Sequence, residues 1–345
     1  MSDPVTAPAA ATGIGSLPGT ESHEWARTIV GELPEFPHIP ELPQRGPGAD
    51  LVGRTMGLLS DVAGDLAVET TPRGWRFADA PGRVMARARS WLSEDLDGME
   101  AVIGATATPL KLQLAGPWTL AANIEMRNGE RAVRDAGACR ELAEALAEAA
   151  ARHLADVERR MPHVTPVLQY DEPSLPTVLA GGVSTASGLA TYRAVDEQRA
   201  RDHLGIALAA AGDRVAGVHC CDPRVPVDLI RRSGAGLISV DLLTLDATQE
   251  EVLGEALDAG CRLLLGVFPS LPAPSRGIAE RAASRLLDQY SRWGFSADAA
   301  NTRVSPTPTC GLAGADPAWA REAYAGVREA GRLVRDDAPA QEEGS

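Results

Sequence analysis

The segment from Pro166 to Pro173 reads PVLQYDEP, and the segment from Val215 to Cys221 reads VAGVHCC. In both, a short apolar run typical of a strand buried on both faces ends in residues that carry acids, bases or thiols. Turn residues and a stretch with helical spacing come next, and this alternation is typical of parallel βα units. The two segments therefore predict an α/β fold whose chemistry lies at the carboxyl ends of its strands.

The same alternation recurs along the whole chain. Eight is the number of strands that closes a (β/α)8 TIM barrel, which is the fold that we predict. The eight apolar runs are Thr12 to Ser16, Ala67 to Thr71, Leu110 to Ala115, Pro166 to Tyr170, Val215 to His219, Leu237 to Asp241, Leu263 to Val267 and Thr302 to Ser305. Four helices rich in favourable residues are predicted at Cys139 to Met161, Gln249 to Ala259, Arg276 to Trp293 and Asp316 to Val334.

We expect a single barrel domain over residues 12–335, because no linker and no internal repeat interrupts the pattern. The segment from Leu33 to Pro47 has five prolines in fifteen residues. It predicts a stiff loop across the top of the barrel, since proline is excluded from central strands. Residues 1–11 and the acidic residues 336–345 are predicted to be disordered tails.

Composition excludes several classes of protein. The 345 residues are 44% hydrophobic and 23% charged, which is typical of a globular domain with a large core. The formal net charge is −14 and Lys111 is the only lysine, so we expect neither a nucleic-acid nor an anionic-membrane partner. No apolar run is long enough to span a bilayer and no export signal is present, which predicts a cytoplasmic protein.

The five cysteines are an odd number in a large chain, which favours free, metal-bound or catalytic thiols over a disulfide framework. Cys139 falls in a predicted helix and Cys261 at a predicted turn, so both are interpreted as buried filler. His219 and Cys221 are two residues apart and share one side of an extended chain, while Cys220 points away.

Two further strand ends supply groups of the same kind. Asp241 ends the predicted strand that follows His219, and Cys310 comes shortly after the last strand. Two thiolates, an imidazole and a carboxylate suit a tetrahedral Zn²⁺ ion. His219, Cys221, Asp241 and Cys310 are therefore the candidate metal ligands.

Asp171 and Glu172 are adjacent, so only one of them can face the barrel axis. Asp171 is the one interpreted as substrate-binding, because it lies among the metal candidates. Glu172 is interpreted as a salt-bridge partner. Near the amino end, the turn from Gly13 to Pro18 contains glycines that can bring backbone N–H groups close to a ligand.

Five motifs in register resemble the carboxyl-terminal catalytic barrel of the cobalamin-independent methionine synthases and its stand-alone relatives. The resemblance covers nearly the whole chain. The motifs are IGS-x-P at Ile14 to Pro18, L-x-GP at Leu114 to Pro117, Q-x-DEP at Gln169 to Pro173, H-x-C at His219 to Cys221 and CGL at Cys310 to Leu312.

The resemblance implies a zinc-dependent methyltransferase that activates a thiol, normally that of homocysteine. A free thiol is mostly protonated at neutral pH, and zinc coordination deprotonates it. The zinc ligands of the family correspond to the four candidates given above. The contacts to the substrate amino acid correspond to Ile14, Gly15, Ser16, Glu69 and the catalytic Asp171.

Three departures from the family pattern count against a plain methionine synthase. The carboxylate ligand is Asp241 where the family usually has glutamate, and the segment GVFPSLPAPSR at residues 266–276 lacks the histidine that serves as a general acid. Asn123 stands where the family has a tryptophan that stacks on the pterin.

We therefore expect a stand-alone relative that keeps the thiol half of the site and uses a donor other than folate. A methylated corrinoid protein, a small sulfonium or another methyl carrier are the candidate donors. Two alternatives remain open: a metal-free enzyme similar to uroporphyrinogen decarboxylase, and a barrel that binds zinc or a ligand without catalysis.

Overall fold

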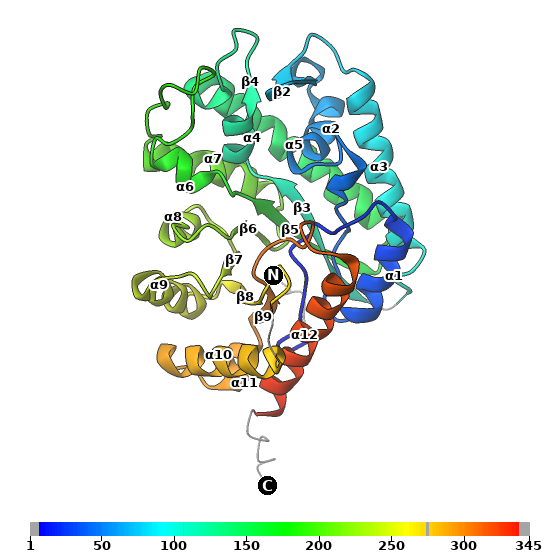
Figure 1. Cartoon of the computed structure of the whole chain (residues 1–345), viewed down its shortest axis with the longest axis vertical. Coiled ribbons are helices and arrows are strands. Elements are labelled where there is room, and N and C mark those ends of the chain that lie inside the picture. Colours follow the sequence, from blue (N-terminus) through cyan, green and yellow to red (C-terminus); the bar gives the residue numbers. More distant parts are fainter. Residues whose placement is uncertain (1–6, 106, 274–275, 338–345) are drawn as a thin grey trace.

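Six parallel strands form a curled sheet at the centre of the structure, in the order β3-β5-β6-β7-β8-β9 (Figure 1). The computed structural model describes residues 7–105, 107–273 and 276–337. The six strands are β3 (Thr108–Ala115), β5 (Val164–Asp171), β6 (Ala216–Cys220), β7 (Leu237–Asp241), β8 (Arg262–Phe268) and β9 (Val304–Pro308). The sequence prediction is thus confirmed for an α/β fold and for six of the eight strands.

The sheet is buried on both faces, as expected for parallel strands under a layer of helices. Every residue of β8, which reads RLLLGVF, is buried. Gly217 lets β6 and β7 approach closely, because a Cβ at this position would lie 1.9 Å from the carbonyl oxygen of Leu237. A side chain there would push apart the two strands that end in His219 and Asp241.

Helices surround the sheet, and the four that were predicted are present (Figure 1). Asp316 begins α12 by accepting a hydrogen bond from the N–H of Trp319, and Asp246 and Gln249 form a reciprocal capping box on α9. The longer helices are α1 (Ser22–Glu32), α2 (Leu51–Val62), α3 (Arg83–Glu100), α5 (Ala136–Arg160), α7 (Glu197–Ala209), α9 (Ala247–Asp258), α10 (Ile278–Trp293) and α12 (Pro317–Asp336). The shorter helices are α4 (Pro117–Asn123), α6 (Leu175–Leu179), α8 (Val227–Arg232) and α11 (Ala297–Asn301).

The predicted strand Ala67 to Thr71 is a strand, but it lies outside the central sheet. It corresponds to β1 (Val68–Thr71), which pairs antiparallel with β2 (Gly74–Phe77) in a small sheet that β4 (Ile124–Glu125) completes. The interpretation of this run as a barrel strand was wrong. A strand of four residues joined to its neighbour by a two-residue turn forms a local hairpin, which has no crossover helix to place it in a parallel sheet.

Two extended segments lie between β9 and β3. The N–H of Thr12 donates to Pro306 of β9, and the N–H of Glu41 donates to Gly15 at 3.2 Å. The N–H of Ile39 donates in turn to Lys111 of β3 at 3.0 Å. Residues 37–42 are all buried, so the proline-rich segment is part of the wall around the sheet and not a loop across its top.

The amino-terminal segment is ordered from residue 7 onward, in contrast to the predicted tail. Ala9 and Ala10 are buried, and the N–H of Ala9 donates to Asn301 at 2.7 Å. This backbone hydrogen bond to the end of α11 and the burial of the small side chains hold the segment in place. At the other end α12 includes Asp336, while residues 1–6 and 338–345 of the predicted tails lie outside the described residues.

Among the described residues, no helix is both long enough and apolar enough to cross a membrane.

Candidate functional site

The chemistry-bearing residues gather at one edge of the central sheet. β5 ends at Asp171, β6 at Cys220 and β7 at Asp241, and Cys310 lies two residues beyond the end of β9. The parallel register pairs Asp171 with His219. This edge is the carboxyl-terminal end of every strand, which is where the sequence placed the site.

Three predicted metal ligands converge. The imidazole of His219 and the thiols of Cys221 and Cys310 offer ligand atoms that all lie within 4.8 Å of one another. The two sulfur atoms are 2.6 Å apart, and both cysteines are free. Residues from β6 and from the segment after β9 thus meet at a single point.

The orientation of His219 suits a metal ligand. Its Nδ1 lies 2.8 Å from the hydroxyl of Ser239 on β7, while its Nε2 is buried and has no hydrogen-bond partner. A buried nitrogen without a partner is costly, and a hydrogen bond at the other ring nitrogen is the usual way to orient a metal-binding histidine. With two sulfur atoms beside Nε2, the donor set matches that of zinc.

Cys220 points away from this cluster, as the alternation along a strand requires. Its side chain is fully buried, and burial raises the pKa of its thiol to about 12. Cys221 and Cys310 behave differently because their sulfur atoms are in hydrogen-bond contact. The hydrogen bond from the Cys221 thiol lowers the pKa of Cys310 to about 4 and raises that of Cys221.

Asp241 lies near the cluster without joining it. Its Oδ1 accepts a hydrogen bond from the N–H of Leu243 at 2.9 Å, and its carboxylate is not among the ligand atoms that converge. Burial raises the pKa of Asp241 to about 6, and the nearby Cys310 acts in the same direction. Of the four predicted ligands, the structure therefore brings three together.

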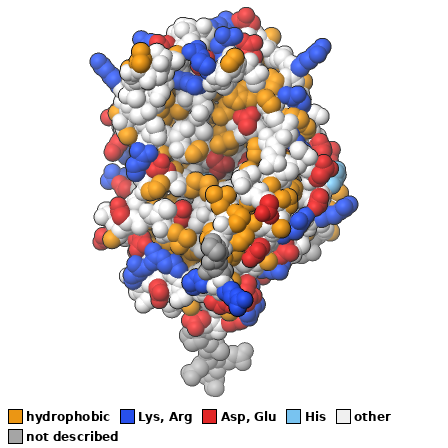
Figure 2. Space-filling model, viewed as in Figure 1, with side chains coloured by type: hydrophobic (Ala, Val, Ile, Leu, Met, Phe, Trp, Pro, Cys, Tyr) orange, Lys and Arg blue, Asp and Glu red, His pale blue; other side chains and the backbone are white. Residues whose placement is uncertain are grey.

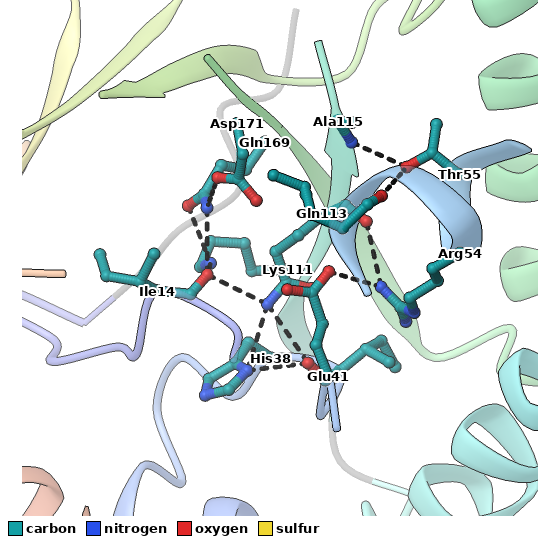
Figure 3. Close-up of polar contacts among 12 residues, drawn as sticks. Ile14, His38, Glu41, Arg54, Thr55, Lys111, Gln113, Ala115, Gln169 and Asp171 are labelled. Atoms are coloured by element: carbon teal, nitrogen blue, oxygen red, sulfur yellow. Dashed lines mark hydrogen bonds and ion pairs between the residues drawn. The ribbon is translucent and has the colours of Figure 1, made fainter. Parts of the chain in front are cut away.

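Asp171 faces the site, and Glu172 does not. Oδ1 of Asp171 accepts a hydrogen bond from the side-chain amide of Gln169 at 2.7 Å (Figure 3). Glu172 instead accepts hydrogen bonds from the N–H groups of Trp118 and Thr119 at the start of α4. It is a helix cap and not the surface salt-bridge partner that the sequence suggested.

A second buried carboxylate, Glu41, completes the site, although the sequence did not identify it. Oε1 of Glu41 lies 2.7 Å from the guanidinium of Arg54, and both side chains are buried (Figure 3). Burial raises the pKa of Glu41 to about 7, and the neighbouring Asp171 also raises it. The available signal was an acidic residue between prolines in a segment interpreted as a loop.

Glu69, the acidic residue that the resemblance assigned to the substrate, lies elsewhere. It is on β1, in the outlying sheet, where its carboxylate pairs with Arg76 at 2.6 Å and is about half exposed. That assignment was wrong, because the strand carrying Glu69 belongs to a hairpin outside the central sheet. Glu41, in contrast, is buried and close enough to Asp171 for the two carboxylates to interact.

The first predicted turn forms the floor of the site. The carbonyl oxygen of Ile14 accepts hydrogen bonds from the side chains of Lys111, Gln113 and Gln169. A Cβ on Gly15 would come within 2.8 Å of the Glu41 carboxylate, so glycine is required by this close approach. Within the described ranges, neither the Gly15 nor the Ser16 N–H has an acceptor.

The turn that carries Cys310 sits directly on this first turn. The N–H of Leu312 donates to the carbonyl oxygen of Ser16 at 2.7 Å, and a Cβ on Gly311 would lie 2.0 Å from the Ser16 hydroxyl. The CGL and IGS motifs therefore pack directly against each other. Packing between them fixes a metal-ligand candidate against the candidate substrate turn.

Asn123, at the end of α4, offers no ring to a ligand. Its side-chain amide donates to the carbonyl oxygen of Thr119 and to the hydroxyl of Ser174. On the face seen in Figure 2, apolar side chains gather near the middle together with a few acidic ones, while the basic side chains lie toward the rim.

Comparisons with known proteins agree with this geometry. The family model described as "Cobalamin-independent synthase, Catalytic domain" matches residues 9–332. Among solved structures, a B12-independent methionine synthase from Shewanella sp. W3-18-1, in complex with selenomethionine, is similar in fold with a TM-score of 0.59. The two chains are 14% identical over 96% of this chain and 98% of the other.

A second structure, SrfJ from Salmonella typhimurium, covers 96% of this chain and 75% of its own at 11% identity, with a TM-score of 0.40. No curated protein matches the sequence. The family match spans nearly the whole of the described chain and every residue of the site. The chain therefore belongs to the cobalamin-independent synthase family, through its catalytic domain, and is a methyltransferase of the methionine synthase type.

Proposed function

We propose that the protein transfers a methyl group to the thiol of homocysteine or a closely similar amino acid, with zinc bound by His219, Cys221 and Cys310. The observation that carries the proposal is the convergence of these three ligand atoms within 4.8 Å, with the buried Asp171 paired to His219 in the strand register. Three protein ligands leave one position of a tetrahedral ion open, which is typical of a catalytic zinc site. Asp241 or water is the proposed fourth ligand before the thiol binds.

Bound zinc would keep the substrate sulfur in its nucleophilic thiolate form at neutral pH. The residues of the chain do the rest. Glu41 and Asp171 present two carboxylates to the ammonium group of the amino acid. The free N–H groups of Gly15 and Ser16 are placed to donate to its carboxylate.

We further propose that the two segments at residues 9–17 and 37–41 stand in for the first two strands of an eight-stranded barrel. Their hydrogen bonds to β9 and β3 support this interpretation. We assign the whole of residues 9–335 to that one domain. The reduced state that zinc–thiolate binding requires supports the cytoplasm as the compartment.

The methyl donor is proposed to be something other than a folate. Asn123 provides no aromatic surface, and the segment at residues 266–276 has no histidine to act as a general acid. A methylated corrinoid protein, which delivers an activated methyl group to a thiolate, is the donor that this pattern favours.

The test of the zinc site is metal analysis of three purified proteins. The wild-type chain and Cys220→Ser should each retain about one zinc ion, and Cys221→Ser should lose it. Homocysteine should then bind to the first two proteins only. Zinc retention in Cys221→Ser combined with loss in Cys220→Ser would refute the ligand assignment.

A further inference from the structure

Lys111 is the only lysine of the chain, and its side chain is completely buried. It lies on β3, and its side chain reaches the turn at Ile14 that forms the floor of the site. Burying an amine costs free energy unless its hydrogens find acceptors, so the acceptors of Lys111 show what the side chain does. None of the steps proposed above uses it.

The contacts of Lys111 lead directly to the site. Its Nζ donates to Oε1 of Gln169 at 2.8 Å and to the carbonyl oxygen of Ile14 at 2.7 Å (Figure 3). The side-chain amide of Gln169 then donates to Oδ1 of Asp171 at 2.7 Å. A continuous chain of three side chains therefore runs from Lys111 to the carboxylate.

This chain has only one possible direction. The carbonyl oxygen of Ile14 and the carboxylate of Asp171 can only accept hydrogen bonds from the Gln169 amide, so the amide oxygen must face Lys111. The amide nitrogen must then face Asp171. Without Lys111 the amide oxygen loses its donor, and the amide is then held through its nitrogen alone, by Asp171 and by the carbonyl oxygen of Ile14.

The two carboxylates of the site are balanced in different ways. Glu41 pairs directly with Arg54 at 2.7 Å. Across the described ranges, Asp171 has no direct ion pair, and Lys111 is the basic side chain that reaches it through Gln169. Glu41 thus has a basic side chain in direct contact, whereas Asp171 is linked to one through Gln169, and no hydrogen bond among the described residues uses its second oxygen.

We propose that Lys111 is a positioning residue for the amino-acid end of the substrate, and that it acts by fixing the Gln169 amide and through it the Asp171 carboxylate. The inference rests on the proposed function, since it assigns Asp171 to the substrate ammonium group. It adds a specificity device: Lys111 matters for thiols that carry an amino-acid group and not for thiols that lack one.

The experiment measures binding of two thiols to the zinc-loaded protein by calorimetry. Homocysteine carries the amino-acid group, and 2-mercaptoethanol does not. In Lys111→Met the affinity for homocysteine should fall about 10- to 100-fold, the range expected when a charged group loses a hydrogen bond. The affinity for 2-mercaptoethanol and the zinc content should stay within about twofold of wild type. Leu112→Met, a buried change on the same strand, should alter neither affinity.

A double variant tests whether Lys111 acts through Gln169. Lys111→Met, Gln169→Leu and the combination should each weaken homocysteine binding to a similar extent, because residues in one hydrogen-bonded chain are not additive. Additive losses would overturn the proposed route. Equal weakening of both thiols, or loss of zinc from Lys111→Met, would show a merely structural role and would also overturn it.

The outcomes separate this inference from the proposed function. Wild-type protein that binds 2-mercaptoethanol on zinc but does not prefer homocysteine would overturn the role of Lys111 and leave the zinc–thiol site intact. Zinc-loaded protein that binds neither thiol would refute the proposed function, and the role of Lys111 with it.

Discussion

The hydroxyl of Ser239 lies 2.8 Å from Nδ1 of His219, so the ring is held by the nitrogen that does not face the two cysteines. Ser239 is on β7 and His219 is its direct neighbour in the sheet register on β6. The partner of the imidazole is thus fixed by strand pairing and not by a flexible loop. This arrangement leaves Nε2 free at the point where the two sulfur atoms meet.

Removal of this hydroxyl should weaken zinc binding. In Ser239→Ala we expect the dissociation constant for zinc to rise about 10- to 100-fold, as is usual when the group behind a histidine ligand is lost. Competition with a chromogenic chelator measures it. Ser305→Ala, which changes another buried serine of the same sheet, is the control. Equal zinc affinity in the two variants would contradict the role of Ser239.

The two acidic residues near the amino end should differ sharply. Glu41→Gln removes a buried charge from the site, so the KM for homocysteine should rise about tenfold or more. Glu69→Gln breaks only an exposed ion pair with Arg76 and should change the KM by less than about twofold. Steady-state assays of both variants at equal zinc content decide the matter. A larger effect from Glu69→Gln would restore the assignment made from the sequence.

Folding stability should depend on pH through His153. Burial is the main reason that the pKa of this histidine falls from 6.5 to about 4. Between these values the unfolded chain binds a proton that the folded chain does not. The stabilisation that His153 contributes is therefore fully present above about pH 6.5 and is lost as the pH falls toward 4. The contribution of this one group reaches about 3 kcal/mol.

The measurement is urea unfolding of the zinc-free, reduced protein at several pH values. His153→Gln should flatten the dependence between about pH 6.5 and pH 4 relative to wild type, whatever its absolute stability. His23→Gln, at an exposed position, should keep the wild-type slope. An unchanged slope in His153→Gln would show that the buried histidine is not the cause.

Strands with continuous apolar runs and a helix after each were predictable from sequence. β5, β6 and β7 begin and end within about two residues of the prediction, because burial on both faces leaves a short apolar run that turn residues bound. Their carboxyl ends then placed Asp171, His219 and Cys221 on one edge. The alternation that separates Cys221 from Cys220 is a local property of extended chain, and it too could be read from the sequence.

The segment around Glu41 could not be predicted in this way. Pro37 and Pro40 lack N–H groups, and proline is normally excluded from buried strands for this reason. The structure avoids the conflict because the N–H groups that pair belong to Ile39 and Glu41. Which N–H groups face a neighbour depends on the register, and register between segments far apart in sequence is not encoded in either segment alone.

The last prediction concerns the methyl donor, for which the structure supplies two arguments. The side chain of Asn123, which the resemblance aligns with a pterin-stacking tryptophan of the family, is held by Thr119 and Ser174 and offers a small amide in place of a ring. The segment after β8 contains no histidine, and loss of a positioned general acid typically lowers a rate by about 10² to 10⁴. The zinc-loaded protein with homocysteine should therefore show little turnover with a polyglutamylated methyl-folate and measurable transfer from methylcobalamin. Cys221→Ser should abolish the transfer, which separates enzymatic from spontaneous methylation. Rapid turnover with the folate would disprove the prediction and would mean that another residue supplies the proton.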